Sequence, residues 1–132
     1  MIEIKHIPPH QIDEVWPFIQ EWVVGALGED ISWTHEDIKE ALKNKQFELR
    51  LITNGELKGF FTSVIYDSPR CKVAYAPWLG GEDLHEWVAQ AFDEFKKYLK
   101  TKDVRQYSFA GRKAWSRFLN VTSEQAAYFI KL

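Results

Sequence analysis

The strongest pattern of apolar and polar positions in the chain lies between residues 84 and 99. Apolar side chains recur there every three or four residues, and charged or amide side chains occupy most positions between them. The apolar set is Leu84, Trp87, Val88, Ala91, Phe92, Phe95, Tyr98 and Leu99. Because residues at this spacing share one side of a helix, the pattern predicts an amphipathic helix with one buried face.

Two further helices are predicted near the start of the chain. Apolar residues repeat at helical spacing over residues 12–26, and Pro17 lies within this stretch. Because proline cannot donate the backbone hydrogen bond to the preceding turn, Pro17 predicts a kink or a division of the helix. Thr34 and Asp37 have the spacing of a capping box, which predicts a second helix over residues 35–43.

Alternating apolar and polar positions predict the strands of a sheet. They are expected at residues 2–6, 47–53, 57–66, 71–76, 104–110 and 125–130. Asn54 and Gly55 predict a tight type I′ hairpin turn, because both residue types tolerate positive φ. With a short helix over 111–119, the order is β-α-α-β-β-β-α-β-α-β. This order predicts one α/β (α+β) domain over 1–132, with a mixed, mostly antiparallel sheet and helices on both faces.

Composition agrees with a folded domain and narrows the compartment. The 132 residues are 45% hydrophobic, and six of them are Trp. No apolar run reaches the ~20 residues that a membrane-spanning helix needs. The first residues do not resemble a signal peptide. Cys71 is the one cysteine and is expected to be a buried strand residue. We therefore expect a protein that is not secreted and has no membrane span.

The charge is distributed unevenly along the chain. The net charge is −2, yet residues 67–132 carry eleven Lys and Arg against eight Asp and Glu. Such a basic half could attract nucleic acid or a phosphorylated ligand. Half of the cluster falls on predicted exposed helix positions, so a solvated surface is the favoured interpretation and nucleic acid is not the expected partner. The four histidines have no metal-ligand spacing, and no metal site is predicted.

A glycine-containing segment joins the fourth predicted strand to the main helix. It reads Trp78-Leu79-Gly80-Gly81-Glu82-Asp83. A strand that runs through glycines into a helix N-terminus is a geometry that binds phosphates. The segment and the order of elements resemble the GNAT superfamily of acyl-CoA-dependent N-acyltransferases. The stretch AGRKAWSRFL also resembles the GR-x-x-W-x-R-x-L signature of short GNAT-like proteins encoded by bacteriophages, some of which are internal virion or head-assembly proteins.

The resemblance implies a site for acetyl-CoA, but the chain departs from the family pattern there. Active GNAT enzymes hold the CoA pyrophosphate on a loop reading Gln/Arg-x-x-Gly-x-Gly/Ala, and this segment has neither the leading Gln or Arg nor Gly-x-Gly. Asp83 and Glu86 instead fit a capping box, so we expect Asp83 to cap the helix where the anion would bind. Aligning Ala114 with the family's alanine puts Phe118 where many GNAT enzymes have the tyrosine that protonates the thiolate.

Candidate site residues follow from the resemblance. Backbone and side chains that would contact acyl-CoA are Trp78, Leu79, Gly80, Gly81, Arg112 and Lys113. Three carboxylates could serve as general base toward an amine: Glu48, Asp67 and Glu82. We retain Glu82, because it neighbours the cleft that such folds open beside the fourth strand. On this interpretation, a β-branched residue at Gly80 or Gly81 should abolish activity without unfolding the protein.

Two functions remain open. The first is a GNAT-fold protein with a degenerate acyl-CoA loop and no cofactor. It would be phage-encoded and act through protein-protein contacts in virion assembly or host interaction, in the host cytoplasm or the virion. The alternative is a divergent acyl-CoA-dependent N-acetyltransferase that uses acetyl-CoA and transfers the acyl group directly to an amine substrate in a ternary complex.

Overall fold

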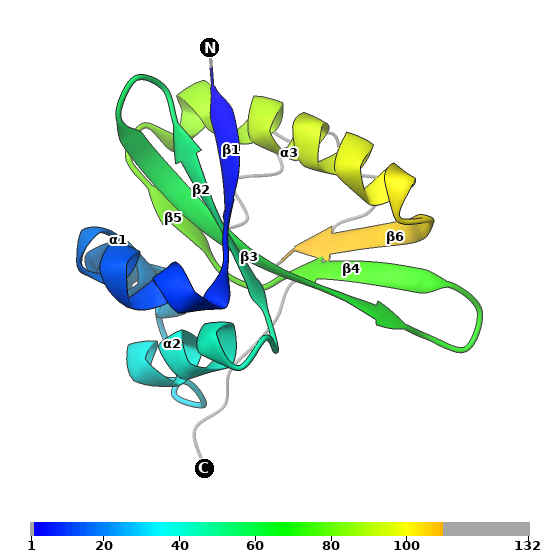
Figure 1. Cartoon of the computed structure of the whole chain (residues 1–132), viewed down its shortest axis with the longest axis horizontal. Helices are drawn as coiled ribbons and strands as arrows, with labels where there is room; N and C mark the ends of the chain where they lie inside the picture. The colour runs from blue at the N-terminus through cyan, green and yellow to red at the C-terminus, as the bar shows by residue number, and fades with distance from the viewer. Residues whose placement is uncertain (1, 110–132) are drawn as a thin grey trace.

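The computed structural model describes residues 2–109 and is organised around one long strand, β3 (Leu57–Asp67) (Figure 1). The sheet has the order β1-β2-β3-β4-β6, and β5 also pairs with β3. All pairs are antiparallel except β4 with β6. The other strands are β1 (Glu3–Ile7), β2 (Glu48–Thr53), β4 (Lys72–Ala76), β5 (Leu79–Gly81) and β6 (Val104–Phe109). The mixed, mostly antiparallel sheet is confirmed.

Helices cover both faces of this sheet, as the sequence predicts (Figure 1). A 3₁₀ turn (Pro9–Gln11) leads into α1 (Ile12–Leu27), and α2 is His35–Lys43. Both pack on the face that carries Leu49 and Phe60. The helix α3 (Leu84–Thr101) packs on the opposite face, against Phe61. The two hydrophobic clusters are therefore separated by the sheet, and β3 contributes to both.

The first two helices confirm one local expectation and contradict another. The capping box of α2 is present, because the Asp37 N–H donates to the Thr34 hydroxyl at 3.1 Å and the Thr34 N–H donates to the Asp37 carboxylate at 2.9 Å. Of the two outcomes predicted for Pro17, a kink or a division of the helix, the division does not occur, and the kink stays a prediction. Pro17 lies on the exposed side of the helix, and buried apolar residues before and after it hold one continuous α1 against the sheet.

The hairpin between β2 and β3 is present but is not a type I′ turn. Thr53 pairs with Leu57, which leaves a three-residue connection, and the register shifts between Ile52 and Thr53. Gly55 has a φ of +80°, whereas Asn54 keeps a negative φ. The Asn54 N–H donates to the Glu56 carbonyl at 2.9 Å. The extra residue relieves the need for two successive positive φ values.

Two expectations near β4 need correction. Cys71 precedes the strand and is half-exposed, so it is not a buried strand residue. The segment with Gly80 and Gly81 is a short strand, β5, and not a loop. The helix predicted over 111–119 and the strand predicted over 125–130 lie outside the described residues. Among residues 2–109, no helix combines the length and the hydropathy that crossing a membrane requires.

Candidate functional site

The candidate site begins at the end of β4. Their parallel pairing runs as far as Ala76 and Phe109. Pro77 follows, and the chain then pairs through β5 with β3 instead, with Leu79 opposite Phe61. Because proline has no N–H to continue the ladder, it permits this change of partner. After β4, the chain that leads into α3 therefore pairs with β3.

Three glycines allow β5 to lie close against β3. Gly81 is opposite Gly59 and has a φ of +146°, and a Cβ on Gly81 would collide with the Lys58 carbonyl oxygen. A Cβ on Gly80 would lie 3.0 Å from the Phe60 ring and 3.1 Å from the Trp22 carbonyl oxygen of α1. Packing alone therefore requires glycine at position 81, whereas a side chain at position 80 would require its neighbours to shift by a few tenths of an ångström. The expected test, in which a β-branched residue at either glycine spares folding, is wrong for Gly81 on steric grounds.

The start of α3 differs from the expected capping box. Asp83 has left-handed backbone angles, with φ 51° and ψ 44°, and its side chain caps no backbone N–H. An N-cap side chain reaches the first turn from extended backbone angles, which Asp83 does not have. Its carboxylate instead lies 3.6 Å from the ammonium nitrogen of Lys58 on β3. The capping role of the Asp83 side chain is therefore wrong; its backbone carbonyl instead accepts from the Glu86 N–H at 2.8 Å, and the described residues show no side-chain cap at this helix N-terminus.

The charge around this turn is negative. Glu82, Asp83 and Glu86 are exposed there, and Lys58 is the basic residue that pairs with one of them. Lys58 also lies 3.1 Å from Glu56. The hydrogen bond to Glu56, followed by the charges of Glu56 and Asp83, raises the pKa of Lys58 against the opposing effect of desolvation. Lys58 therefore stays charged, but two carboxylates already share its charge.

Trp78 and Leu79 can offer only backbone to a ligand. Their exposed fractions are 6% and 4%. The Trp78 ring packs edge-on against Trp33 at 5.0 Å and against Phe47 at 5.2 Å between centroids. Leu79 packs in the cluster beneath α3. Both side chains belong to the core, so a direct side-chain contact with a cofactor is not supported.

Glu82 has a fixed backbone and an exposed side chain. Its N–H donates to the Lys58 carbonyl at 2.8 Å, and its carbonyl accepts from the Trp87 indole N–H at 2.7 Å. Glu82 lies in the same turn that would bind the pyrophosphate. A general base at Glu82 and a pyrophosphate would therefore occupy the same position, so the two predicted roles of this turn conflict. Arg112, Lys113 and Phe118 lie outside the described residues.

A carboxylate and a phenol that the sequence patterns do not indicate, Asp30 and Tyr75, interact electrostatically. Asp30, in the α1–α2 connection, accepts from the Ser32 hydroxyl at 2.5 Å and from the Ser32 N–H at 2.8 Å. These bonds hold the pKa of Asp30 below its ordinary value. Burial, and then the charges of Asp30 and Tyr66, raise the pKa of Tyr75 on β4. The Asp-x-Ser spacing is a local signal that could have identified this turn.

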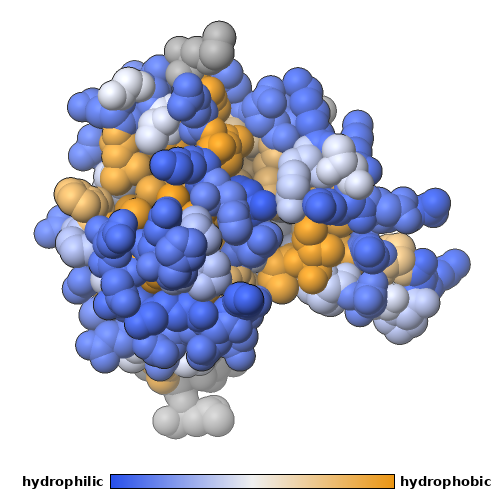
Figure 2. Space-filling model, viewed as in Figure 1, coloured by the Kyte–Doolittle hydropathy of each residue, from blue (hydrophilic) through white to orange (hydrophobic). Residues whose placement is uncertain are grey.

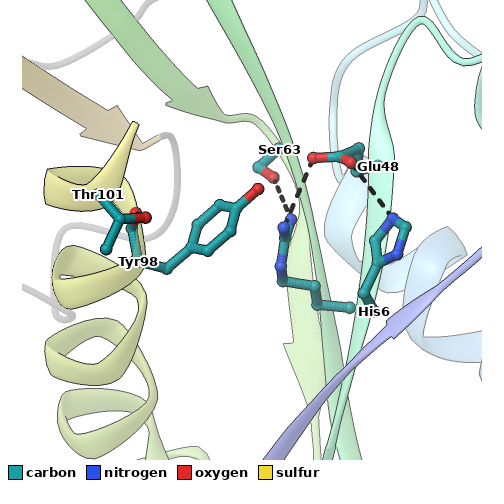
Figure 3. Close-up of polar contacts among 6 residues, drawn as sticks. His6, Glu48, Ser63, Tyr98 and Thr101 are labelled. Carbon is teal, nitrogen blue, oxygen red and sulfur yellow. Dashed lines mark hydrogen bonds and ion pairs between the residues drawn. The ribbon is translucent and has the colours of Figure 1, made fainter. Parts of the chain in front are cut away.

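A second polar cluster lies on the α3 face of β1, β2 and β3 (Figure 3). The His6 ring lies 3.2 Å from the Glu48 carboxylate, and the other Glu48 oxygen lies 3.5 Å from the guanidinium of Arg50. Arg50 donates to the Ser63 hydroxyl at 2.9 Å. The Arg50 guanidinium also stacks on Phe95 and Tyr98, 4.9 and 4.8 Å from their ring centroids. Glu48, a candidate base in the sequence, is thus already engaged by two partners.

Metal-ligand groupings are not found within residues 2–109, because no three His, Cys, Asp or Glu side chains there converge. Asp67, the third candidate carboxylate, is exposed at the end of β3. The turn before α3 is the place where the sequence predicts a ligand, and there the structure shows β5 paired with β3 and a helix start whose N-cap side chain makes no capping bond.

Known proteins resemble the chain in structure and not in sequence. No family model matches it, and no curated protein matches its sequence. A ribosomal-protein-alanine N-acetyltransferase from Brucella melitensis biovar Abortus 2308 superposes with a TM-score of 0.70 at 12% identity, covering 100% of this chain and 99% of that one. An aminoglycoside acetyltransferase from an uncultured soil metagenomic sample, in complex with sisomicin, gives 0.68 at 12% identity, covering 99% and 95%.

A third solved structure, an aminoglycoside N-acetyltransferase in complex with CoA, gives a TM-score of 0.64 at 13% identity, covering 99% of this chain and 95% of that one. These neighbours are GNAT acetyltransferases. At such identities the likeness concerns the fold, and activities are a separate question. We conclude that this chain has the fold of the GNAT N-acetyltransferases.

Proposed function

We propose that the chain is a divergent acyl-CoA-dependent N-acyltransferase that acts on an amine acceptor. The observation that carries the proposal is the N-terminus of α3, which the Asp83 side chain does not cap and which follows directly after β5. Backbone N–H groups at a helix N-terminus attract anions, and here no side chain of the helix start occupies them. The main argument for a blocked site, capping by Asp83, is therefore removed.

Backbone groups would hold the pyrophosphate in this proposal. The first turn of α3 supplies them, and Arg112 and Lys113 would supply the positive charge that Glu82, Asp83 and Glu86 oppose. Glycines let the backbone of β5 approach closely, but one side of β5 is already paired with β3. Only its opposite side is available to a ligand. The affinity is expected to be modest, because the local carboxylates repel a phosphate.

The acceptor would be held as a cation before it reacts. Asp30 is fixed by Ser32, and its lowered pKa keeps it anionic, which suits an ion pair with an ammonium group and not a role as base. The bound ammonium must lose a proton to Glu82 or to water. Its nitrogen then forms a bond to the thioester carbonyl carbon as the carbon–sulfur bond breaks and the electron pair leaves on sulfur. The second proton of the nitrogen passes, directly or through water, to the thiolate, which gives the amide and free CoA. The chain's contribution is chiefly to position the two reactants.

Thermal unfolding with and without millimolar acetyl-CoA tests the first step. Ligand at 100 times its Kd stabilises by about 2.7 kcal/mol, which raises the Tm of a domain of this size by several degrees. A Tm rise would be followed by an acetyl-transfer assay on a polyamine, an aminoglycoside and a peptide amine. The variant Glu82→Gln distinguishes two roles of Glu82. If Glu82 only repels the pyrophosphate, the variant should bind acetyl-CoA more tightly with unchanged kcat. If Glu82 is the general base, kcat should fall strongly.

A second candidate function has its own support. Phe18, Val24 and Ile31 are 71%, 49% and 76% exposed, and apolar side chains on a surface favour protein contacts. With the acidic turn before α3, this favours a GNAT-fold protein that acts through a protein partner. The phage-like stretch AGRKAWSRFL extends this candidate to virion assembly or host interaction. No Tm shift with acetyl-CoA and no transfer to any of the three amines would favour it over catalysis.

A further inference from the structure

The strand β3 is longer than its partner β2 at one end. Pairing between them ends where Glu48 lies opposite Ser63. The strand β3 continues through Asp67, and over residues 64–67 it pairs with β4. Among the described residues, the other side of this four-residue stretch has no strand partner. We call it the β3 edge.

The direction of the backbone groups on the β3 edge follows from neighbouring hydrogen bonds. The Thr62 N–H donates to the Trp78 carbonyl at 3.0 Å, and the Lys58 carbonyl accepts from the Glu82 N–H at 2.8 Å. Even-numbered residues of β3 therefore direct their backbone groups toward β4 and β5. Because the direction alternates along an antiparallel strand, Ile65 and Asp67 direct their N–H and C=O groups toward the free side.

A hollow of about 380 Å³ adjoins the first residues of this edge. Its apolar lining comes from the connection between α2 and β2, the end of β1 and the edge itself. The lining includes Ile7, Pro9, Leu42, Phe47, Val64 and Ile65. Glu48 and Ser63, labelled in Figure 3, also line it, and the Arg50 guanidinium lies 2.9 Å from the Ser63 hydroxyl and 3.5 Å from the Glu48 carboxylate. The hollow is large enough to receive one bulky apolar side chain.

Apolar surface remains visible around this region. Figure 2 shows it between the lobe that carries α1 and α2 and the arm formed by β3, β4 and β6. Tyr66, on the edge itself, is 50% exposed. Natural edge strands usually carry lysine or proline that prevents pairing with another chain, and residues 64–67 read Val-Ile-Tyr-Asp. The edge therefore has neither lysine nor proline, and its charged residue is Asp67.

The charges around the edge are mainly positive. Within residues 2–109, Lys45, Arg70 and Lys72 make no ion pair, and Asp67 is the one acidic residue of the edge. Glu48 is already engaged by His6 and Arg50. An acidic partner would therefore be attracted to this surface, and a basic one repelled.

We propose that the β3 edge binds an extended acidic peptide segment of a partner protein, which adds a strand beside residues 64–67 and places an apolar side chain in the hollow. Main-chain hydrogen bonds would supply affinity, and the hollow and the charges would supply specificity. A narrow occupant fits, because the α2–β2 connection stands at one end of the edge and the Pro69 turn at the other. This inference does not depend on acyl-CoA binding.

A display library of random octapeptides, selected against the folded protein, tests the proposal. Enriched peptides should combine Asp or Glu with one bulky apolar residue, and their binding should weaken as salt is raised. The Asp67→Pro variant removes one edge N–H on the free side, and an edge position tolerates proline. We expect this variant to lose about fivefold in affinity, which corresponds to one hydrogen bond.

Charge variants and spectroscopy complete the test. Lys45→Glu should weaken the enriched peptides, whereas Lys100→Glu, at an exposed position of α3, should not. On peptide addition, the amide protons of Ile65 and Asp67 should become protected from solvent exchange. The Asp67→Pro protein should have a Tm within a few degrees of wild type, which shows that the substitution does not disrupt the fold. If its Tm is lower, the amide-exchange result on the wild-type protein decides whether the peptide binds at the β3 edge.

Three results would overturn the proposal. They are no enrichment of peptides, enriched peptides that bind Asp67→Pro and Lys45→Glu as well as wild type, and amide protection confined to other strands. Dimerisation of the protein alone, measured by sedimentation and abolished by Asp67→Pro, would assign the edge to a second copy and would likewise contradict a peptide partner.

Discussion

The ammonium nitrogen of Lys58 on β3 lies 3.6 Å from the carboxylate of Asp83 at the start of α3. This pair draws the Asp83 side chain toward the sheet, while the left-handed backbone of Asp83 keeps it from the first turn of the helix. As a result, the N-terminus of α3 can attract an anion, because the Asp83 carboxylate is directed toward Lys58 and not toward the first turn of the helix. The first prediction follows from this arrangement.

Asp83→Asn should strengthen acetyl-CoA binding if the turn receives the pyrophosphate. Asparagine keeps the shape and tolerates left-handed backbone angles, and it removes one repelling charge. We expect a larger Tm rise with acetyl-CoA than wild type gives at the same concentration. Asp93→Asn, at an exposed position in the middle of α3, is the matched control and should leave the Tm rise unchanged. Equal Tm rises in wild type, Asp83→Asn and Asp93→Asn would show that the turn at Asp83 does not bind acetyl-CoA.

Gly81→Val should destabilise the fold by about 3 kcal/mol or more. The added Cβ would meet the Lys58 carbonyl oxygen, and a φ of +146° is unsuited to a β-branched residue. Gly25→Ala, inside α1 with no atom near its Cβ position, is the control and should stabilise by about 0.5–1 kcal/mol. Urea unfolding followed by circular dichroism measures both. A Gly81→Val protein as stable as wild type would contradict the close packing of β5 on β3.

Arg50→Ala should cost about 2–3 kcal/mol of unfolding free energy. The substitution removes the bond to Ser63, the stack on Phe95 and Tyr98, and the positive charge beside Glu48. Arg105→Ala, exposed on β6, should change stability by no more than about 0.5 kcal/mol. Denaturant unfolding of the two variants checks the difference, and equal losses would show that the cluster in Figure 3 contributes no net stability.

Tyr107→Phe should stabilise the protein by about 1–2 kcal/mol. The Tyr107 hydroxyl is buried and has no hydrogen-bond partner among the described residues, and phenylalanine removes that uncompensated group. Burial raises the pKa of Tyr107 well above its ordinary value of 10.0. The unfolded chain therefore ionises first, and wild type loses stability as pH rises above about 10, up to the folded-state pKa.

The alkaline loss should be smaller in Tyr107→Phe than in wild type, because the substituted side chain has no proton to release. Tyr66→Phe, half-exposed on β3, is the matched control and should not stabilise the protein. Thermal unfolding from pH 8 to 11 measures both effects. A loss of stability in Tyr107→Phe at neutral pH would contradict the prediction, because it would mean that the Tyr107 hydroxyl makes a stabilising hydrogen bond.

Acid should weaken the turn that holds Asp30. Bonds from Ser32 lower the pKa of Asp30, so their contribution is present above the ordinary value of 3.8 and is lost as pH falls through the lower folded-state pKa. Asp30→Asn should flatten the fall in Tm between pH 5 and pH 2. Asp13, whose pKa is lowered by Lys43 and Lys39, contributes to the same fall and remains in the variant. If Tm falls with pH as steeply in Asp30→Asn as in wild type, Asp30 does not contribute to the acid sensitivity.

Local patterns predicted most of the elements because each depends on residues close in sequence. The periodicity from Leu84 predicted α3, and the spacing of Thr34 and Asp37 predicted the start of α2. The fold class followed from the order of these elements. The resemblance to GNAT proteins rested on this order, and the solved structures agree with it at the level of the fold.

The errors arose where distant residues decide the local geometry. Nothing in the spacing of Asp83 and Glu86 distinguishes extended from left-handed backbone angles, and the difference depends on how β5 pairs with β3. Glycines have low strand propensity, so β5 could be recognised only through its partner Gly59. Asp30 and Tyr75 lie 45 positions apart in the chain, and their proximity has no sequence signal.

Adjacent residues Phe60 and Phe61 are both fully buried, yet they belong to opposite hydrophobic clusters. Because β3 contributes to both clusters, loss of packing in one cluster also disturbs the other. The two halves should therefore melt in a single cooperative transition, in which calorimetric and van't Hoff enthalpies coincide. The slowest amide protons to exchange should be those of β3 between residues 59 and 63, since only global unfolding exposes them.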